Sequence, residues 1–179
     1  MKITIFWFAW SGTSTIWKKL SERLWYKSMS SWNIMREWAK KLGQTIYEFE
    51  EKEAKNNENF DRELDSKVRE FWINNDDFVY ESRLAWYFIP DSYKICLKCD
   101  EDERYRRIKK RENIDINDVI EKNKKRESEL KKRYTLIYPE INFPPKEEYF
   151  DIVIDSTKID PDEIVDMIIS KIWIKYMTF

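Results

Sequence analysis

The residues best suited to chemistry lie at the start of the chain, where hydroxyl side chains follow an apolar segment. The alternation of residues 2–6 predicts a strand, and residues 13–24 carry apolar side chains at helical spacing. The first turn of a helix presents free backbone N–H groups and the positive end of its dipole, which attract anions. The pattern predicts a phosphate site formed by Trp7, Phe8, Ala9, Trp10, Ser11, Gly12, Thr13, Ser14 and Thr15.

Two positions of this predicted turn carry an unexpected type of residue. A phosphate loop normally contains glycines, because its backbone takes positive φ and approaches the phosphate oxygens closely. Trp7 and Trp10 stand where glycine is expected, and Gly12 is the glycine that remains. An indole at either position disfavours positive φ and fills the volume of a phosphate, so genuine tryptophans predict weak or lost nucleotide binding.

Composition excludes several classes of function. The 179 residues predict one domain spanning 1–179, and 33 basic against 34 acidic residues predict no bulk attraction to nucleic acid or membrane. The absence of histidine excludes serine-histidine triads and most zinc enzymes. Without a signal-peptide pattern or a long apolar run, the expected compartment is the cytoplasm.

The two cysteines form a C-x-x-C pattern that resembles a redox or metal motif. Cys96 and Cys99 lie in a predicted strand, where residues three apart point to opposite faces. Ordinary packing is therefore favoured over redox or metal chemistry for both thiols.

Strands and helices alternate along the chain, which favours a single α/β unit with a parallel sheet. Polar residues 81–83 follow the third predicted strand, at the carboxyl end of the sheet, where open α/β folds bind ligands. The predicted strands are 2–6, 26–29, 78–80, 95–99 and 149–155. One predicted helix begins at 13, and another runs from a Ser30-Ser31 cap to 42. Three more predicted helices cover 45–54, 59–73 and 161–176.

Residues 104–138 form the most charged stretch and predict two helices with a break near 112–115. Arg126 and Arg133 are seven residues apart, so they share a helix face with Glu129 and Leu130. The face is either a solvated basic surface or an arginine clamp on phosphates. The charge pattern alone favours the solvated surface.

Five segments carry distinct sequence patterns, and the order and spacing of these patterns along the chain are informative. They are W-F-A-W-S-G-T-S-T at 7–15, S-S-W-N-I-M-R at 30–36, F-D-R-E-L-D at 60–65, E-S-R-L-A-W at 81–86 and K-R-E-S-E-L-K-K-R-Y at 125–134. Together they resemble the archaeal-type cytidylate kinases, a group of P-loop nucleoside monophosphate kinases, over nearly the whole chain. The family patterns are G-x-x-G-x-G-T-T-T, S-x-G-x-I-x-R, I-D-R-x-x-D, E-G-R-L-A-G and K-R-E-x-S-x-x-K-R-Y. Thr13 matches a threonine common in this group, and Ser128 is displaced by one place.

This resemblance implies a three-layer α/β/α P-loop kinase fold with a five-stranded parallel sheet and a mobile helical lid within about 104–138. It implies transfer of the γ-phosphoryl group of ATP to CMP or dCMP, with Mg²⁺ bridging the phosphates. The implied partners are small-molecule nucleotides, without nucleic acid or membrane, and the implied state is a monomer.

The resemblance also implies roles for individual residues. Gly12, Thr13, Ser14 and Thr15 would hold the donor phosphates, with the Ser14 hydroxyl toward Mg²⁺. Ser30, Arg36, Asp65 and Arg83 would bind the acceptor, the two arginines through its phosphate. Arg107 and Arg111 fall in the lid, and the implied catalytic residues are Arg111, Arg126 and Arg133. A surface ion pair is the alternative for Arg36 and Arg83, and a pair with Arg62 or Arg69 is the alternative for Asp65.

The departures from the family patterns share one feature. Trp7, Trp10, Trp25, Trp32 and Trp86 all stand where the family has glycine, in a chain with nine tryptophans and two glycines. Drift would scatter the replacements over many residue types. We hypothesise that glycine codons have been read as tryptophan, since UGA encodes glycine in some genetic codes and tryptophan in others. UGG codons at these positions would contradict this hypothesis.

Two other functions remain open at this stage. Genuine tryptophans would favour an inactive, kinase-like binding module that uses an aromatic patch, because tryptophan is enriched at contact hot spots. A kinase of another nucleoside or nucleoside monophosphate would keep the fold and change the acceptor.

Overall fold

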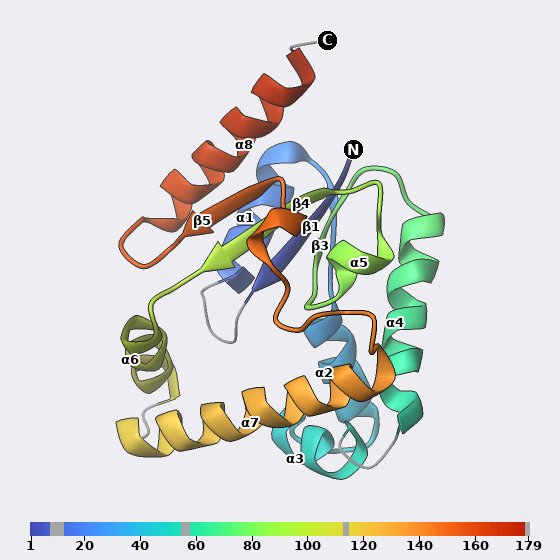
Figure 1. Cartoon of the computed structure of the whole chain (residues 1–179), viewed down its shortest axis with the longest axis vertical. Helices are drawn as coiled ribbons and strands as arrows, with labels where there is room; N and C mark the ends of the chain where they lie inside the picture. Colours follow the sequence, from blue (N-terminus) through green and yellow to red (C-terminus); the bar gives the residue numbers. More distant parts are fainter. Residues whose placement is uncertain (8–12, 55–57, 113–114, 178–179) are drawn as a thin grey trace. The chain divides into compact units, whose positions relative to one another are not determined.

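The structure is a computed structural model that describes residues 1–7, 13–54, 58–112 and 115–177. Its five strands form one sheet in the order β2-β3-β1-β4-β5 (Figure 1). The strands are β1 (Lys2–Trp7), β2 (Lys27–Ser30), β3 (Phe78–Glu81), β4 (Tyr93–Lys98) and β5 (Ile152–Asp155). The predicted five-stranded parallel sheet is confirmed.

Helices follow the strands in the predicted alternation. They are α1 (Thr13–Leu24), α2 (Ser31–Lys41), α3 (Ile46–Phe49), α4 (Glu58–Ile73), α5 (Ala85–Phe88), α6 (Glu101–Glu112), α7 (Ile116–Ile137) and α8 (Pro161–Met177). A π-helical turn, η1 (Glu50–Ala54), follows α3, and a 3-10 turn, η2 (Glu147–Tyr149), precedes β5.

The ends of the first four predicted strands differ from the structure by one or two residues, and two further predictions were wrong by more. The helix expected over 45–54 is divided into α3 and the π-helical turn η1. The strand expected from Tyr149 begins at Ile152, because the N–H groups of Tyr149 and Phe150 donate to the carbonyls of Lys146 and Glu147 in the 3-10 turn. Those two donors are therefore committed locally and do not join the sheet ladder.

The chain forms two compact units, and each is described by itself. The first unit comprises residues 1–6 and 17–94, and the second comprises residues 7–16 and 95–179.

In the first unit, β3 pairs in parallel with both β1 and β2. Helix α4 packs on this part of the sheet through the apolar stripe expected from its sequence. Phe60, Leu64 and Val68 are buried, and the ring of Phe71 lies edge-on to Phe78 and Tyr80 at centroid distances of 5.1 and 5.4 Å. A burial of this kind stabilises the fold by about 1.5–3 kcal/mol for each large apolar side chain.

Helices α2, α3 and α4 of the first unit share a separate cluster of buried side chains. Its members are Met35, Ala39, Phe49, Phe60 and Leu64. The ring of Phe60 is edge-on to both Trp38 and Phe49, at 5.7 and 5.6 Å between centroids. This cluster fixes the position of α2, which follows directly after β2.

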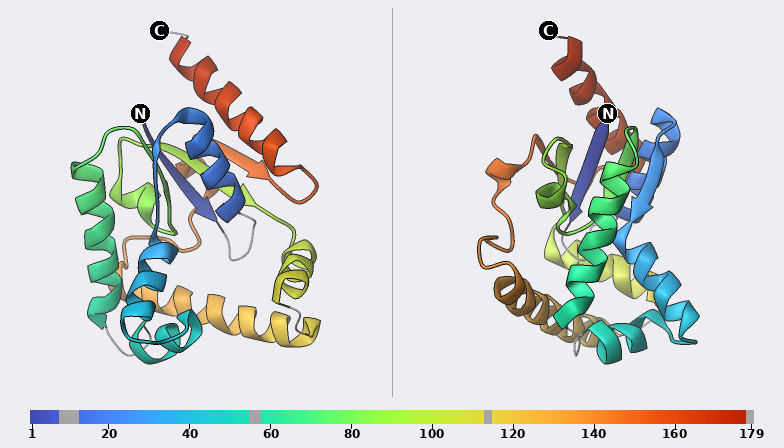
Figure 2. Two further views of the ribbon diagram at one scale, coloured as in Figure 1. Left: turned by 180° about the vertical axis from the view of Figure 1, so that it is seen from behind. Right: turned by 90° about the vertical axis from the view of Figure 1, so that its right-hand side faces the viewer.

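In the second unit, β4 and β5 pair in parallel from Ile95 opposite Ile152 to Lys98 opposite Asp155. Helix α8 returns after β5 (Figure 2), and the Lys175 ammonium lies 2.6 Å from the Asp151 carboxylate that precedes the strand. The apolar residues that α8 buries are Ile164, Val165, Ile168 and Ile172. Pro161 is the first residue of α8, the position expected for a proline at a helix start.

Helices α1 and α2 end in the same backbone conformation. After α2, Gly43 has φ of +66°, and the N–H groups of Gly43 and Gln44 donate to Lys40 and Ala39 at 3.1 and 2.9 Å. After α1, Trp25 has φ of +58°, and the N–H groups of Trp25 and Tyr26 donate to Glu22 and Ser21 at 3.3 and 2.9 Å. Both endings are Schellman motifs, in which a left-handed residue follows the helix.

Because the backbone at Gly43 is left-handed, we predict that a substitution there costs free energy through backbone strain alone. A Cβ built there meets nothing within 4 Å, so Gly43→Ala introduces strain without a steric clash. We expect the free energy of unfolding, measured with urea, to fall by about 1 kcal/mol. The exposed helical control Lys41→Ala should change it by less than about 0.5 kcal/mol. An equal effect of the two substitutions would contradict this prediction.

Candidate active site

The donor side of the predicted site belongs to the second unit. Trp7 ends β1 and is half-buried, and Phe8, Ala9, Trp10, Ser11 and Gly12 lie outside the described residues. Thr13 is buried, whereas Ser14 and Thr15 are exposed in the first turn of the 12-residue helix α1. Two hydroxyl groups therefore lie in the first turn of a helix, whose backbone N–H groups have no partner within the helix, and this arrangement is suited to an anion.

The Ser14 side chain also fits the predicted Mg²⁺. Within the described residues, no group of three or more carboxylate, histidine or cysteine side chains could hold a metal ion. Mg²⁺ that accompanies a nucleotide keeps several waters and takes substrate phosphate oxygens, so it needs few protein ligands. One exposed hydroxyl at the helix start satisfies that requirement.

The acceptor side belongs to the first unit and is centred on the carboxyl ends of β2 and β3. Ser30 and Glu81 lie opposite each other in the strand register. Their exposed fractions are 1% and 3%, and the Ser30 hydroxyl donates a 2.7 Å hydrogen bond to Glu81 Oε2. A buried carboxylate requires such a donor, because unpaired burial of its charge is costly.

This hydrogen bond corrects one prediction and adds a residue. Ser30 occupies the N-cap position of α2, but its side chain makes no capping hydrogen bond. The hydroxyl is already directed to Glu81. Sequence reasoning placed Glu81 among the polar residues 81–83 at the carboxyl end of the sheet but did not select it as a site residue. Its position directly after an apolar strand segment was the available signal.

The two predicted acceptor arginines lie close to tryptophans. Arg36 is exposed on α2, where it donates a long 3.5 Å hydrogen bond to Asn33 and lies 5.7 Å from the ring centroid of Trp32. Arg83 is half-buried just after β3, and its carbonyl accepts a 3.0 Å hydrogen bond from the indole of Trp86. The contacts of Arg36 are weak and exposed, so they hold its guanidinium loosely.

Asp65 lies in a buried polar region between α4 and β3. Asp61 and Asp65 are one turn apart on α4 and are both buried, and burial together with the charge of Asp65 raises the pKa of Tyr80. Of the two arginines considered as partners of Asp65, Arg62 is exposed and Arg69 lies 4.6 Å from the ring centroid of Phe88. Asp65 is thus a buried carboxylate in the first unit, not a surface one.

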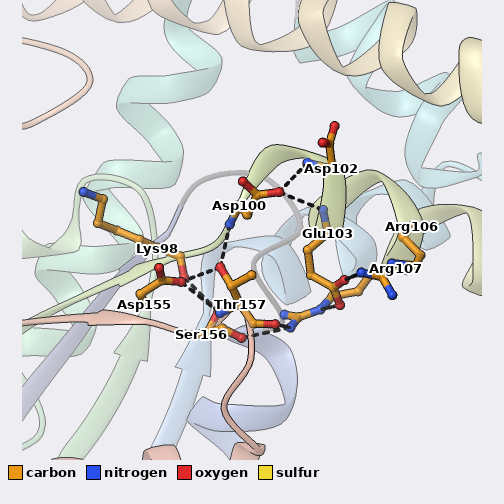
Figure 3. Close-up of polar contacts among 9 residues, drawn as sticks. All are labelled: Lys98, Asp100, Asp102, Glu103, Arg106, Arg107, Asp155, Ser156 and Thr157. Atoms are coloured by element: carbon orange, nitrogen blue, oxygen red, sulfur yellow. Dashed lines mark hydrogen bonds and ion pairs between the residues drawn. The ribbon is translucent and has the colours of Figure 1, made fainter.

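In the second unit, the loop after β5 is joined to the start of α6 by hydrogen bonds (Figure 3). The Thr157 hydroxyl accepts from the backbone N–H of Asp100 at 2.8 Å and donates to the Asp155 carboxylate. The Asp100 carboxylate caps α6 by accepting from the N–H groups of Asp102 and Glu103 at 2.9 and 3.3 Å. Hydrogen bonds from the Thr157 hydroxyl and backbone lower the pKa of Asp155.

Arg107 extends the same network along α6. Its Nε donates to Glu103 at 2.9 Å, and its Nη2 donates to the carbonyls of Ser156 and Thr157 at 2.9 and 3.2 Å (Figure 3). The backbone N–H of Ser156 in turn donates to Lys98 at the end of β4. The arginine predicted only as a lid residue therefore anchors α6 to the strand ends of the second unit.

Helices α6 and α7 form the pair predicted for residues 104–138. The Arg104 guanidinium lies 2.9 Å from the Glu127 carboxylate, and both side chains are largely removed from solvent. Arg126 and Arg133 are half-buried on α7, and Arg111 belongs to α6, with its side chain outside the described residues. The Arg126 and Arg133 side chains are thus each partly covered and partly open to solvent, and the arginine clamp on phosphates stays a prediction.

The cysteines behave as packed thiols. Cys96 is buried, and burial raises its pKa to about 11. Burial also raises the pKa of Cys99. Both thiols are protonated near neutral pH and are poor nucleophiles as a result.

The Thr157 contacts predict a pH-dependent contribution to stability. The depressed pKa of Asp155 means that its contribution is present above the unfolded pKa of about 3.9 and is lost as pH falls through the lower folded pKa. Thr157→Val removes the hydroxyl, so it should raise the Asp155 pKa and destabilise the protein more at neutral pH than near pH 2. Carboxyl NMR titration and unfolding at both pH values measure this. The control Thr135→Val, at an exposed position on α7, should leave the Asp155 pKa unchanged. A loss of stability in Thr157→Val that is equal at both pH values would contradict the proposed role of the Thr157 hydroxyl in stabilising ionised Asp155.

Comparison with known proteins identifies relatives over nearly the whole chain. The model of the cytidylate kinase-like family matches residues 2–158. The cytidylate kinase of Archaeoglobus fulgidus is 33% identical over 176 residues, which cover 98% of this chain and 96% of that protein. The cytidylate kinase of Methanocaldococcus jannaschii is 34% identical over 177 residues, with 96% and 97% covered.

Solved structures show the same fold. Shikimate kinase from Acinetobacter baumannii, in complex with shikimate, superposes with a TM-score of 0.66 at 17% identity and covers 97% of this chain and 93% of that chain. At this identity the likeness concerns the fold alone, and it confirms the predicted three-layer α/β/α architecture. Among the described residues, none of the helices has the length and apolar character needed to cross a membrane.

Proposed function

The chain belongs to the cytidylate kinase-like family, and from this we propose that it transfers the γ-phosphoryl group of ATP to CMP or dCMP. The observation that carries the proposal is the family match over residues 2–158, which includes all five patterned segments. In this reaction an oxygen of the acceptor phosphate attacks the γ-phosphorus of ATP. The bond from that phosphorus to the β,γ-bridging oxygen breaks, and ADP leaves.

The start of α1 would bind the donor. Gly12, Thr13, Ser14 and Thr15 would surround the ATP phosphates, with the exposed hydroxyl of Ser14 toward Mg²⁺. Mg²⁺ bound with ATP would supply positive charge to the β- and γ-phosphate oxygens. Backbone N–H groups and the helix dipole add to this charge, so the start of α1 supports the transfer by positioning and neutralisation.

The strand ends of the first unit would bind the acceptor phosphate. Arg83 lies two residues after the end of β3, and the Ser30–Glu81 hydrogen bond holds the neighbouring strand ends together. Arg36 is held only by weak contacts on an exposed helix face, so its guanidinium can turn toward a phosphate at little cost. Arginine suits this role because its planar donors match phosphate oxygens in pairs.

Asp65 would contribute to the choice of base. Cytosine carries an amino group at position 4, which donates a hydrogen bond, whereas uracil carries a carbonyl oxygen there. A buried carboxylate accepts from the amino group and repels the carbonyl oxygen. The burial of Asp65 supports this role, because a hydrogen bond is worth more where water is excluded.

Helices α6 and α7 would act as a lid within a single domain of residues 1–179. Arg111, Arg126 and Arg133 would contact the transferred group as charge develops on it, and closure would exclude water. The Arg104–Glu127 pair would let the two helices move as one element, and the Arg107 contacts with the loop after β5 would be the fixed end of that movement. We further propose a cytoplasmic monomer that acts on small-molecule nucleotides and not on nucleic acid.

The test is a kinetic panel of nucleoside monophosphates with Mg²⁺ and ATP. It compares the chain as written with the double variant Trp7→Gly/Trp10→Gly. We expect the double variant to bind ATP more tightly and to phosphorylate CMP and dCMP at least about tenfold better than UMP, AMP or GMP. In the same background, Asp65→Asn should lose the preference for cytidine over uridine. Preference for another acceptor would identify that nucleotide as the substrate in place of CMP and dCMP. Absence of ATP binding in both chains would refute the phosphate site at the start of α1.

Arg83 provides a second test of the acceptor side. Arg83→Ala in the double-glycine background should lower kcat/KM for CMP by about a hundredfold, because a charged donor to the acceptor phosphate is lost. Arg83→Lys should recover part of the activity. The control is Arg23→Ala, which removes an exposed arginine of the same unit outside the five patterned segments and should leave kcat/KM within about twofold. Similar losses for Arg23→Ala and Arg83→Ala would show a general charge effect instead.

A further inference from the structure

Trp25 occupies a backbone position that suits glycine. Among the residues that the structure describes, it is the one non-glycine residue with positive φ, at +58°. Its two hydrogen bonds reproduce those around Gly43, where φ is +66°. The chain thus contains the same helix ending twice, once with glycine and once with tryptophan.

The tryptophan at this position has no packing role that offsets its strain. A Cβ in the left-handed region lies too close to the following carbonyl oxygen, so tryptophan carries a penalty there that glycine does not. Trp25 is 93% exposed, so its indole gains almost nothing from burial. Local backbone geometry therefore favours glycine at this position independently of any comparison with relatives.

Two other tryptophans at glycine positions of the family patterns are packed, unlike Trp25. Trp32 packs against the cluster shared by α2, α3 and α4 and lies over the guanidinium of Arg36. Trp86 is buried, and its indole donates to the backbone carbonyl of Arg83. Each indole therefore contacts a residue proposed to bind the acceptor phosphate.

We propose that position 25 is glycine in the polypeptide made by the protein's own cells, and that positions 7, 10, 32 and 86 are glycine for the same reason. A UGA codon translated there as glycine is written here as tryptophan. Glycine at 25 relieves the backbone strain that follows α1, and glycine at 32 and 86 removes the two indoles that contact Arg36 and Arg83. The argument at position 25 rests on the backbone and does not depend on the proposed function.

The direct test is the gene together with the natural protein. We expect UGA at codons 7, 10, 25, 32 and 86, and mass spectrometry of the protein purified from its own cells should read glycine in the peptide that spans residue 25. UGG at codon 25, or tryptophan in that peptide, would overturn the proposal.

A stability series tests the backbone argument separately. Trp25→Gly should raise the folding equilibrium constant about fivefold, whereas Trp25→Ala, which keeps the Cβ, should raise it much less. The matched control is Trp173→Gly, because Trp173 is 57% exposed within helix α8. Glycine there should lower the constant, since it weakens a helix interior. A lower folding equilibrium constant for Trp25→Gly, or equal effects of glycine and alanine at position 25, would refute the proposed backbone strain at Trp25.

Discussion

The proposed acceptor side depends on one buried hydrogen bond, from the Ser30 hydroxyl to the Glu81 carboxylate. It joins the last residues of two neighbouring parallel strands, at the edge where α/β sheets bind ligands. Removal of either partner would leave a buried polar group unpaired, which costs about 1–3 kcal/mol and more for a charge. The bond therefore stabilises the strand ends and also sets where α2 and Arg83 leave the sheet.

The second unit uses the same principle with different residues. There the ends of β4 and β5 are joined to α6 through Thr157, Asp100 and Arg107. The backbone polar groups at the strand ends are satisfied by side chains, so the loop is fixed without regular secondary structure. The same contacts support the helix pair that carries Arg126 and Arg133. In both units, the groups that a nucleotide would need emerge from strand ends that hydrogen bonds hold in place.

Local periodicity was enough to predict much of this fold. The apolar stripe of α4 and the five strand segments follow from patterns within a few residues, and the structure confirms them. The division of 45–54, the 3-10 turn before β5 and the four-residue helix α5 were missed, because such short elements carry too few residues for a period.

The contacts of the candidate site were less predictable, since they join residues distant in the chain. Ser30 was assigned to a helix cap by its neighbours, while its partner Glu81 lies 51 residues away. Arg107 was placed in the lid by position, although its carbonyl partners are 49 and 50 residues further on. The family patterns supplied the arginines and hydroxyls of the proposed site, and the backbone geometry at Trp25 then supported the hypothesis that glycine belongs at that position.

The proposed acceptor site lies at the carboxyl ends of β2 and β3. A titration of the isotopically labelled protein with CMP, followed by amide NMR, tests this location most directly. We expect the largest shifts to cluster at Ser30, Ser31, Glu81 and Arg83 and to saturate with added CMP. Shifts confined to other parts of the chain would contradict it.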